Sequence, residues 1–409
     1  MHIGLVCDPR SFHTQKWGKA LLKAGARVTV FSFWEADLGP DLPCVRIRPS
    51  HTRKGQLTYF SYLFGGKALA QAVHAHQVDI LNPINVTPFG VWVHQSGFQP
   101  VGSIAMGADI LEFPPQRKML KIRDEQRWES LKTQPQGIFD RWVQEVKWRL
   151  FRFQVKKALD SASFLTGDNQ ELVDRMRDWF GVPEAKSSLN RWGVDPALFA
   201  ATPEQLAALR KKYGIESGQK VIFSPRGLKP IYQGDIILDA FAQLLTSGPQ
   251  PIKLILLSAG YGVPPTWHQR ALQLQAQDDR FYYEPGLIPR EEMGRLWNLV
   301  DIFISAPVYD GLSNALVEGC YVGAYPIVND IPGNHEVVVD GKNGEMLADF
   351  SASQLSQSLL RVLDEYEDRQ KIARPYNQAW VQEHAMLATN IRRFLQQCEA
   401  VLSSHQAMD

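Results

Sequence analysis

Short runs of apolar residues recur along the chain, separated by segments whose apolar positions repeat with helical spacing. The clearest runs occupy residues 2–6, 27–31, 163–166, 220–224, 253–258, 300–305 and 325–328. β-Branched and aromatic residues dominate these runs, a composition typical of strands buried on both faces of a parallel sheet. Helices are predicted between them, most clearly at 170–180, 203–213 and 291–299. This alternation predicts an α/β protein built from βαβ units.

Residues 299–349 show the pattern most completely, as a strand, a loop, a helix and a second strand. The loop contains Asp310, the helix opens near Ser313 with polar N-cap candidates, and Gly323 ends it. In parallel α/β sheets, ligands bind where strands end and the following helices begin. The loop that contains Asp310 is therefore the expected site.

Asp310 and Glu318 are separated by seven residues. If Asp310 lies at the mouth of the helix, Glu318 lies about two turns further in, roughly 12 Å along the axis. The backbone amides of Gly311, Leu312 and Ser313 would be free donors at a positive helix terminus, which suits phosphate. Carboxylates on either side of a phosphate site could bind the hydroxyls at the two ends of a nucleotide sugar. The alternative is an N-cap Asp and a solvated helical Glu.

Composition excludes several classes of protein. The length of 409 residues suggests two or three domains, and 44% hydrophobic content is enough for sizeable cores. A net charge of +1 argues against a general nucleic-acid binder. The four cysteines are far apart without a CxxC pair, which argues against disulfides and a cysteine zinc site. The start, MHIGLVCD, lacks signal-peptide features, so we expect a cytoplasmic protein.

The run DGLSNALVEG (310–319), followed by IPGNHEVVVDGKNGEML (331–347), resembles the donor-site signature of the retaining GT-B glycosyltransferases of family 4. The first acid of that signature is usually Glu, whereas this chain has Asp310. The resemblance implies two Rossmann-like domains that face each other across a cleft. Residues 1–193 would form the acceptor domain, joined by a returning helix at 385–409, and residues 194–384 the donor domain.

The resemblance also implies roles for individual residues. Glu318 would bind the donor ribose, Asp310 the sugar hydroxyls and Arg226 the diphosphate, and Asp109 would contact sugar or acceptor. Gln233 stands where many relatives have a diphosphate-binding Lys, and Lys229 is a candidate substitute. The other donor-binding candidates are Gly286, Leu287 and Ile288, whose backbone would hold the nucleobase, the amides of Gly311, Leu312 and Ser313, and Glu336.

The expected activity is transfer of a sugar from a nucleoside diphosphate sugar, with retention of configuration, and it requires neither metal nor cofactor. The acceptor would be a sugar, a lipid-linked molecule or a small molecule. Arg10 and His13 follow the first strand, where relatives have a substrate-facing loop, although His13 would equally suit a helix cap or a surface position. Alternatives are a phosphorylase or epimerase on the same fold, or a GT-B protein that binds without catalysis.

Residues 116–157 have a different composition, with twelve Lys or Arg residues against five Asp or Glu residues. Apolar side chains recur there at helical spacing: Phe139, Trp142, Val143, Val146, Leu150 and Phe153. One interpretation is a basic, aromatic surface that binds anionic lipid or a lipid-linked acceptor at the inner face of the membrane. The alternatives are packing of these side chains on the first domain, or a protein partner.

Overall fold

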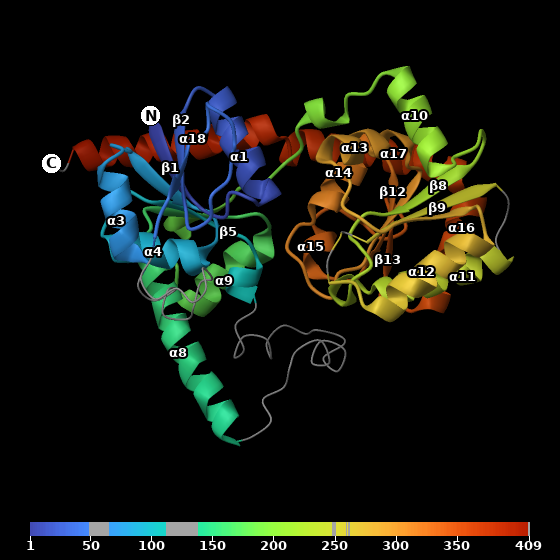
Figure 1. Cartoon of the computed structure of the whole chain (residues 1–409), viewed down its shortest axis with the longest axis horizontal. Coiled ribbons are helices and arrows are strands. Elements are labelled where there is room, and N and C mark those ends of the chain that lie inside the picture. The colour runs from blue at the N-terminus through green and yellow to red at the C-terminus, as the bar shows by residue number, and fades with distance from the viewer. Residues whose placement is uncertain (49–64, 112–137, 248–250, 259, 261, 408–409) are drawn as a thin grey trace. The chain divides into compact units, whose positions relative to one another are not determined.

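The computed structural model describes residues 1–48, 65–111, 138–247, 251–258, 260 and 262–407 (Figure 1). The described chain divides into two compact units, the first formed by 1–111, 138–192 and 387–407, and the second by 193–386. Each unit is a parallel sheet with helices on both faces, so the predicted α/β class with two Rossmann-like domains is confirmed.

The first unit contains seven parallel strands. They are β1 (His2–Val6), β2 (Arg27–Ser32), β3 (Cys44–Arg46), β4 (Ile80–Pro83), β5 (Gly102–Ala105), β6 (Phe164–Gly167) and β7 (Ser187–Leu189). One sheet has the order β3-β2-β1-β4 and the other β5-β6-β7. Two parallel bridges, Leu81–Val101 and Ile84–Ile104, join β4 to β5. The strand order therefore reverses between β1 and β4, where Rossmann-like sheets bind ligands.

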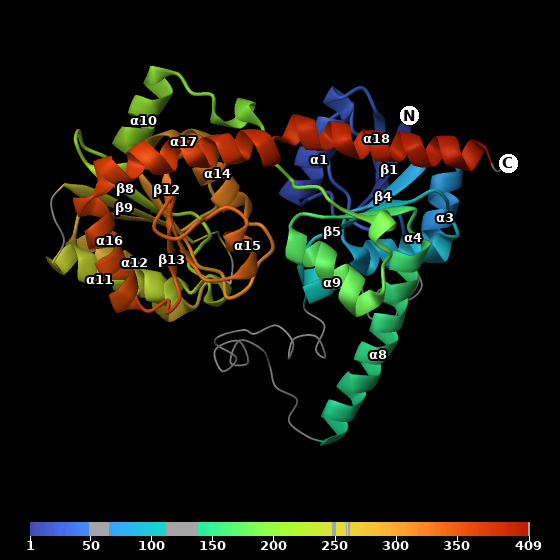
Figure 2. The same cartoon turned by 180° about the vertical axis from the view of Figure 1, so that it is seen from behind.

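Helices cover both faces of the first sheet. They are α1 (Phe12–Lys23), α3 (Gly66–His74), η1 (Val86–Gly90), α4 (Val91–Ser96), α5 (Ala108–Leu111), α8 (Ile138–Ser161), α9 (Gln170–Phe180), η2 (Glu184–Lys186) and α18 (Leu387–Gln406). Helix α18 lies beside α1 in both views (Figure 2). Its Phe394 contacts Trp17 of α1 and Phe164 of β6, with ring centroids 5.2 and 5.5 Å apart. The last helix of the chain thus belongs to the core of the first unit.

The second unit contains six parallel strands. They are β8 (Lys220–Ser224), β9 (Ile252–Leu257), β10 (Phe281–Glu284), β11 (Ile302–Ser305), β12 (Tyr325–Asn329) and β13 (Glu345–Leu347), in the order β10-β9-β8-β11-β12-β13. All residues of β9, β11 and β12 are buried, as expected for central strands covered on both faces. The strand order reverses between β8 and β11, so the loops that follow these two strands border the expected ligand crevice.

Two sets of helices enclose this second sheet. They are η3 (Pro196–Phe199), α10 (Pro203–Tyr213), η4 (Pro230–Tyr232), α11 (Gly234–Ser247), α12 (Pro265–Gln277), α13 (Arg290–Leu296), η5 (Trp297–Leu299), α14 (Asn314–Val322), α15 (Pro332–His335), α16 (Ala352–Asp364) and α17 (Tyr366–His384). Side chains of α11, α12 and α16 pack on one face, and those of α13, η5 and α14 on the other. The second set therefore borders the loop that contains Asp310.

Candidate donor site

Two side chains meet where the strand order of the second unit reverses. Arg226 follows β8 and Asp310 follows β11, and the Nη2 atom of Arg226 lies 2.5 Å from an Asp310 carboxylate oxygen. The guanidinium also lies over the ring of Tyr232, 4.4 Å from its centroid. Burial acts to lower the pKa of Arg226, but Asp310 and Tyr232 raise it above its ordinary value. The structure therefore brings together the residues expected to bind diphosphate and sugar, and keeps the arginine charged.

The loop between β11 and α14 differs in detail from the expectation. The amide of Gly311, expected to be free, donates to Asp310 Oδ1 at 3.0 Å. Ser313 is the N-cap of α14, but its hydroxyl accepts from Arg226 Nη1 at 3.0 Å and makes no side-chain cap. Leu312 and Ser313 are buried. The acidic residue, the arginine and the start of the helix are thus one hydrogen-bonded unit.

Glu318 lies closer to the start of the helix than expected. Because α14 begins at Asn314, Glu318 is about 6 Å along the axis, just over one turn, and not two turns in. Only 4% of Glu318 is exposed, which excludes the alternative of a solvated surface glutamate. Its Oε1 forms an ion pair with Arg290, and its Oε2 accepts from Trp297 Nε1 at 3.2 Å. Neither Arg290 nor Trp297 belongs to a sequence motif, so neither could be recognised as a partner of Glu318 from the sequence.

The loop between β8 and α11 contains Gln233, which stands where many relatives have a lysine, and Lys229, the candidate substitute. Gln233 is buried in a left-handed conformation, with φ of 51°, and its Nε2 donates to the carbonyl oxygen of Ala306 at 3.2 Å. This bond ties the loop to the end of β11. Lys229 is half-buried, and burial, followed by the charge of Arg226, lowers its pKa. Lys229 therefore supplies an amine in the electrostatic range of Arg226.

The segment expected to hold a nucleobase lies between β10 and α13. Leu287 is 71% exposed, while Ile288 is half-buried against the core. The Gly286 carbonyl accepts from Ser258 Oγ at 3.4 Å. Glu336 is half-buried and follows α15 directly. Their predicted donor contacts stay predictions.

The candidates in the first unit follow β1 and β5. Arg10 forms a bidentate pair with Asp8, at 2.9 and 2.8 Å, and stacks on Trp34 with 4.3 Å from its Cζ atom to the ring centroid. The ring of His13 packs against that of Trp192, with 5.1 Å between centroids. Arg10 lies in the loop that follows β1, and His13 lies in the first turn of α1.

The Asp109 carboxylate accepts hydrogen bonds from two backbone amides. Its two carboxylate oxygens accept from the amides of Val86, at 2.6 Å, and Met106, at 2.9 Å. Only 7% of the residue is exposed, and burial raises the pKa of Asp109 to about 6. The carboxylate therefore joins the loop after β4 to the loop after β5, and its predicted sugar contact stays a prediction.

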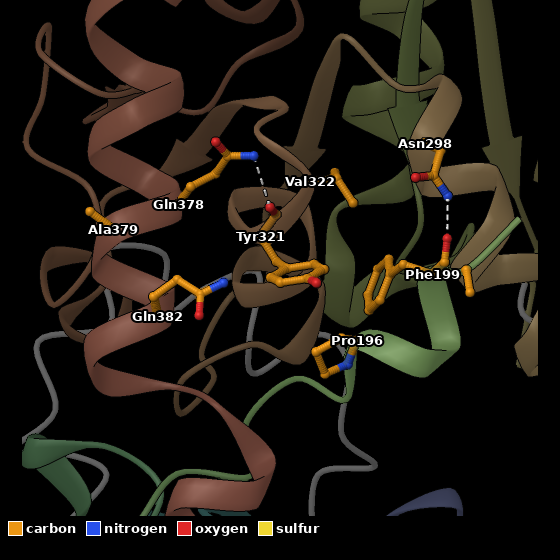
Figure 3. A pocket seen from close by; sticks show the side chains of 9 residues that line it. Pro196, Phe199, Asn298, Tyr321, Val322, Gln378, Ala379 and Gln382 are labelled. Atoms are coloured by element: carbon orange, nitrogen blue, oxygen red, sulfur yellow. Dashed lines mark hydrogen bonds between the residues drawn. The ribbon is translucent and has the colours of Figure 1, made fainter.

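A separate cavity of about 680 Å³ lies at the other end of α14 (Figure 3). Tyr321 and Phe199 line it with ring centroids 5.0 Å apart, and Gln378 donates to the Tyr321 carbonyl oxygen at 3.3 Å. Its lining residues are all uncharged: Pro196, Phe199, Ala200, Asn298, Tyr321, Val322, Gln378, Ala379 and Gln382. An uncharged lining does not suit a diphosphate, so the large cavity is not the donor site.

The described residues hold neither a metal-binding cluster nor a membrane-spanning helix. Within the described ranges, no three His, Cys, Asp or Glu side chains are grouped so that they could hold a metal ion. No helix in the described part of the chain is long and apolar enough to cross a membrane.

The chain matches two protein families. Residues 207–378 match the family described as Glycosyl transferases group 1, and residues 2–126 match Glycosyl transferase 4-like. The D-inositol 3-phosphate glycosyltransferase of Corynebacterium efficiens is 23% identical over 221 residues, 52% of this chain and 51% of that relative. The matched part of this chain thus spans about half the length of that relative.

Solved structures share the fold over almost the whole chain. A glycosyltransferase from Rickettsia africae ESF-5 has a TM-score of 0.73 at 14% identity and covers 98% of both chains. Anabaena Alr3699/HepE in complex with UDP has a TM-score of 0.71 at 16% identity and covers 98% of this chain and 100% of that chain. The chain belongs to the group 1 glycosyltransferases and has the GT-B fold.

Proposed function

We propose that this glycosyltransferase moves a sugar from a nucleoside diphosphate sugar to an acceptor hydroxyl and retains the anomeric configuration. The supporting observation is the Arg226–Asp310 ion pair across the reversal of strand order, with the buried Glu318 in the helix that follows. Complexes of Anabaena Alr3699/HepE with UDP and UDP-glucose support the same class of donor for this chain.

Each group has a distinct role in the proposed reaction. Glu318 accepts hydrogen bonds from the ribose and Asp310 from the sugar hydroxyls. Arg226 has five N–H donors, so it can pair with Asp310 and still reach the diphosphate. The amides of Leu312 and Ser313 at the start of α14 add positive potential to the same place. Together these groups stabilise the charge that develops on the leaving diphosphate.

The proposed step breaks the bond between the anomeric carbon and the diphosphate oxygen. The acceptor oxygen forms its bond to the anomeric carbon on the face that the diphosphate leaves, and the hydroxyl proton passes to a departing phosphate oxygen. The products are the glycoside and the nucleoside diphosphate. Attack on this face accounts for retention without a covalent intermediate. Arg226 and the helix terminus supply the charge compensation that a metal ion gives in other enzymes.

A panel of nucleotide sugars tests the proposal. UDP, GDP and ADP sugars are incubated with the protein, with and without candidate acceptors, and nucleoside diphosphate release is measured. We expect release with at least one donor, and proton NMR of the first product should show the donor's anomeric configuration. Release that depends on inorganic phosphate would indicate a phosphorylase instead. Nucleotide binding without release under any condition would indicate a binding protein.

We also propose that the acceptor side of the first unit binds anionic lipid through α8. Much of 116–157 lies outside the described residues, but three described side chains form an exposed apolar stripe: Val146, Leu150 and Phe153, with exposures of 36%, 51% and 54%. Their spacing of four and three residues puts them on one helix face. The Lys157 ammonium lies 4.6 Å from the centroid of the Phe153 ring. An apolar stripe bordered by cations suits an anionic bilayer surface.

The structure determines which substitutions test this lipid proposal. Arg152 and Lys156 donate to the carbonyl oxygens of Trp179 and Phe180, so reversing their charge would disturb the packing of α8 on α9. The double substitution Leu150→Ser and Phe153→Ser removes exposed apolar surface only. Wild-type protein should co-sediment with anionic vesicles at low salt, and the double variant should not. Equal sedimentation of both, or none of either, would contradict the proposal.

A further inference from the structure

The buried carboxylate of Glu318 has two fixed partners from a single segment. Arg290, the first residue of α13, forms an ion pair with Oε1, and Trp297, which follows the same helix, donates to Oε2 at 3.2 Å. Trp297 is 1% and the Glu318 side chain 5% exposed, whereas the Arg290 side chain is 26% exposed. The orientation of the carboxylate is therefore set from α13 and η5, and not by its own helix.

This arrangement leaves the carboxylate able to bind a ligand. A carboxylate has about four lone-pair positions, two on each oxygen. Among the described residues, one protein donor bonds each oxygen, which leaves a second position on each for a ligand. Burial lowers the pKa of Arg290 to about 10. This pKa is still far enough above neutral pH for the guanidinium to stay protonated. The guanidinium charge thus stays beside the carboxylate, whose orientation is fixed by the ion pair and by the Trp297 hydrogen bond.

The segment that holds the carboxylate also follows the loop expected to hold the nucleobase. Gly286, Leu287 and Ile288 precede Arg290 by two to four residues, and Pro289 between them is the N-cap of α13. Proline fixes its own φ, which limits how far the loop can move relative to the first turn of the helix. Base contacts and the orientation of the carboxylate are therefore linked through α13.

We propose that Arg290 is a positioning residue that sets the ribose specificity of the donor site. Together with Trp297 it holds Glu318 so that the free lone pairs accept the ribose hydroxyls, and a 2′-deoxynucleotide loses that contact. This inference rests on the proposed function, because it assigns the ribose to Glu318. It goes further in naming the residue on which the preference for ribose over deoxyribose depends.

The test compares matched pairs of nucleotides by isothermal titration calorimetry. Wild-type protein is titrated with UDP, GDP and ADP and with their 2′-deoxy counterparts. The ratio of the two dissociation constants is taken for the base that binds most tightly. We expect a ratio of about tenfold or more for wild type, since a hydrogen bond to a charged group is among the strong ones. Arg290→Met should reduce the ratio to about threefold or less, through weaker ribonucleotide binding alone.

Three further variants keep the result interpretable. Arg290→Lys keeps the charge but not the planar fork and should give an intermediate ratio. Trp297→Phe keeps the ion pair, removes the second donor and should also lower the ratio. If circular dichroism shows that Arg290→Met does not fold, Arg290→Lys and Trp297→Phe take its place in the comparison. Arg295→Met is the matched control, because Arg295 lies on the same helix and interacts with Glu292, and it should keep the wild-type ratio.

Each outcome has a distinct meaning. A wild-type ratio in folded Arg290→Met and in Arg290→Lys would overturn the inference and leave the proposed function intact. Tighter ribonucleotide binding by Arg290→Met would also overturn it, because Arg290 would then compete for the ribose site. Failure of wild-type protein to bind any nucleoside diphosphate would overturn the proposed function and the inference together.

Discussion

Replacing Arg226 with alanine isolates the group on which diphosphate binding should depend most. The substitution removes the ion pair to Asp310 at 2.5 Å, the hydrogen bond to Ser313 Oγ at 3.0 Å, and the cation over Tyr232. Neither member of the ion pair is deep in the core. The Arg226 and Asp310 side chains are 19% and 28% exposed. Asp310 can therefore be solvated when its partner is removed.

The expected magnitudes for affinity and stability differ. A partly exposed ion pair contributes up to about 1 kcal/mol to the free energy of unfolding. A charge-assisted bond to the diphosphate contributes about 1.5–3 kcal/mol to binding, which corresponds to a tenfold to roughly 150-fold loss of affinity. Arg226→Ala should thus bind nucleoside diphosphate at least tenfold more weakly while its melting temperature falls by only a few degrees. The nucleotide affinity of Arg226→Lys should lie between those of wild type and Arg226→Ala, since lysine keeps the charge without the bidentate fork.

Calorimetric titration and thermal unfolding of the same samples measure the two quantities. Arg270→Ala is the matched control, because Arg270 pairs with Asp239 in the same unit with both side chains half-exposed. It should lose as much stability as Arg226→Ala and keep its nucleotide affinity within about twofold. Unchanged affinity in folded Arg226→Ala would refute the reasoning. So would an equal loss of affinity in the Arg270 control.

Three more outcomes follow from the geometry. Glu318→Gln should lower the free energy of unfolding by about 1.5–3 kcal/mol in urea titrations, because it removes the charged partner of Arg290 from a buried position; a stability within 1 kcal/mol of wild type would contradict this. Wild-type stability should fall as pH rises from about 4 to 6, since the folded protein binds the Asp109 proton more tightly than the unfolded chain, and Asp109→Asn should lack this contribution. Sugar transfer should persist in excess EDTA, and loss restored by added Mg²⁺ or Mn²⁺ would show that a metal takes part.

The strands and the main loop could be predicted because their signals are local. β11 and β12 are continuous apolar runs, and burial on both faces requires this composition wherever the strand is central. The start of α14 follows a polar N-cap residue, Ser313, and Gly323 ends the helix in a left-handed conformation. β3, by contrast, is three residues long with no buried residue, so its composition gave no signal.

The contacts of the site could not be predicted because they join distant segments. Arg290 and Glu318 are 28 residues apart, and Asp109 accepts from an amide 23 residues away. The ribose role expected for Glu318 did not include its two protein partners, which come from α13 and η5. Spacing along one helix gives an axial distance, but it cannot reveal which buried charge a second helix contributes.

Hydrogen–deuterium exchange with and without nucleoside diphosphate tests the central claim most directly. Wild-type protein is exchanged alone and with saturating UDP, GDP or ADP, and peptides are compared by mass spectrometry. We expect slower exchange in three segments that follow β8, β10 and β11: residues 226–234, 285–290 and 306–318. Arg226→Ala at the same nucleotide concentration should lose this protection. Protection confined to the uncharged cavity around Phe199 and Tyr321, or absent from all three segments with every nucleotide, would contradict the account.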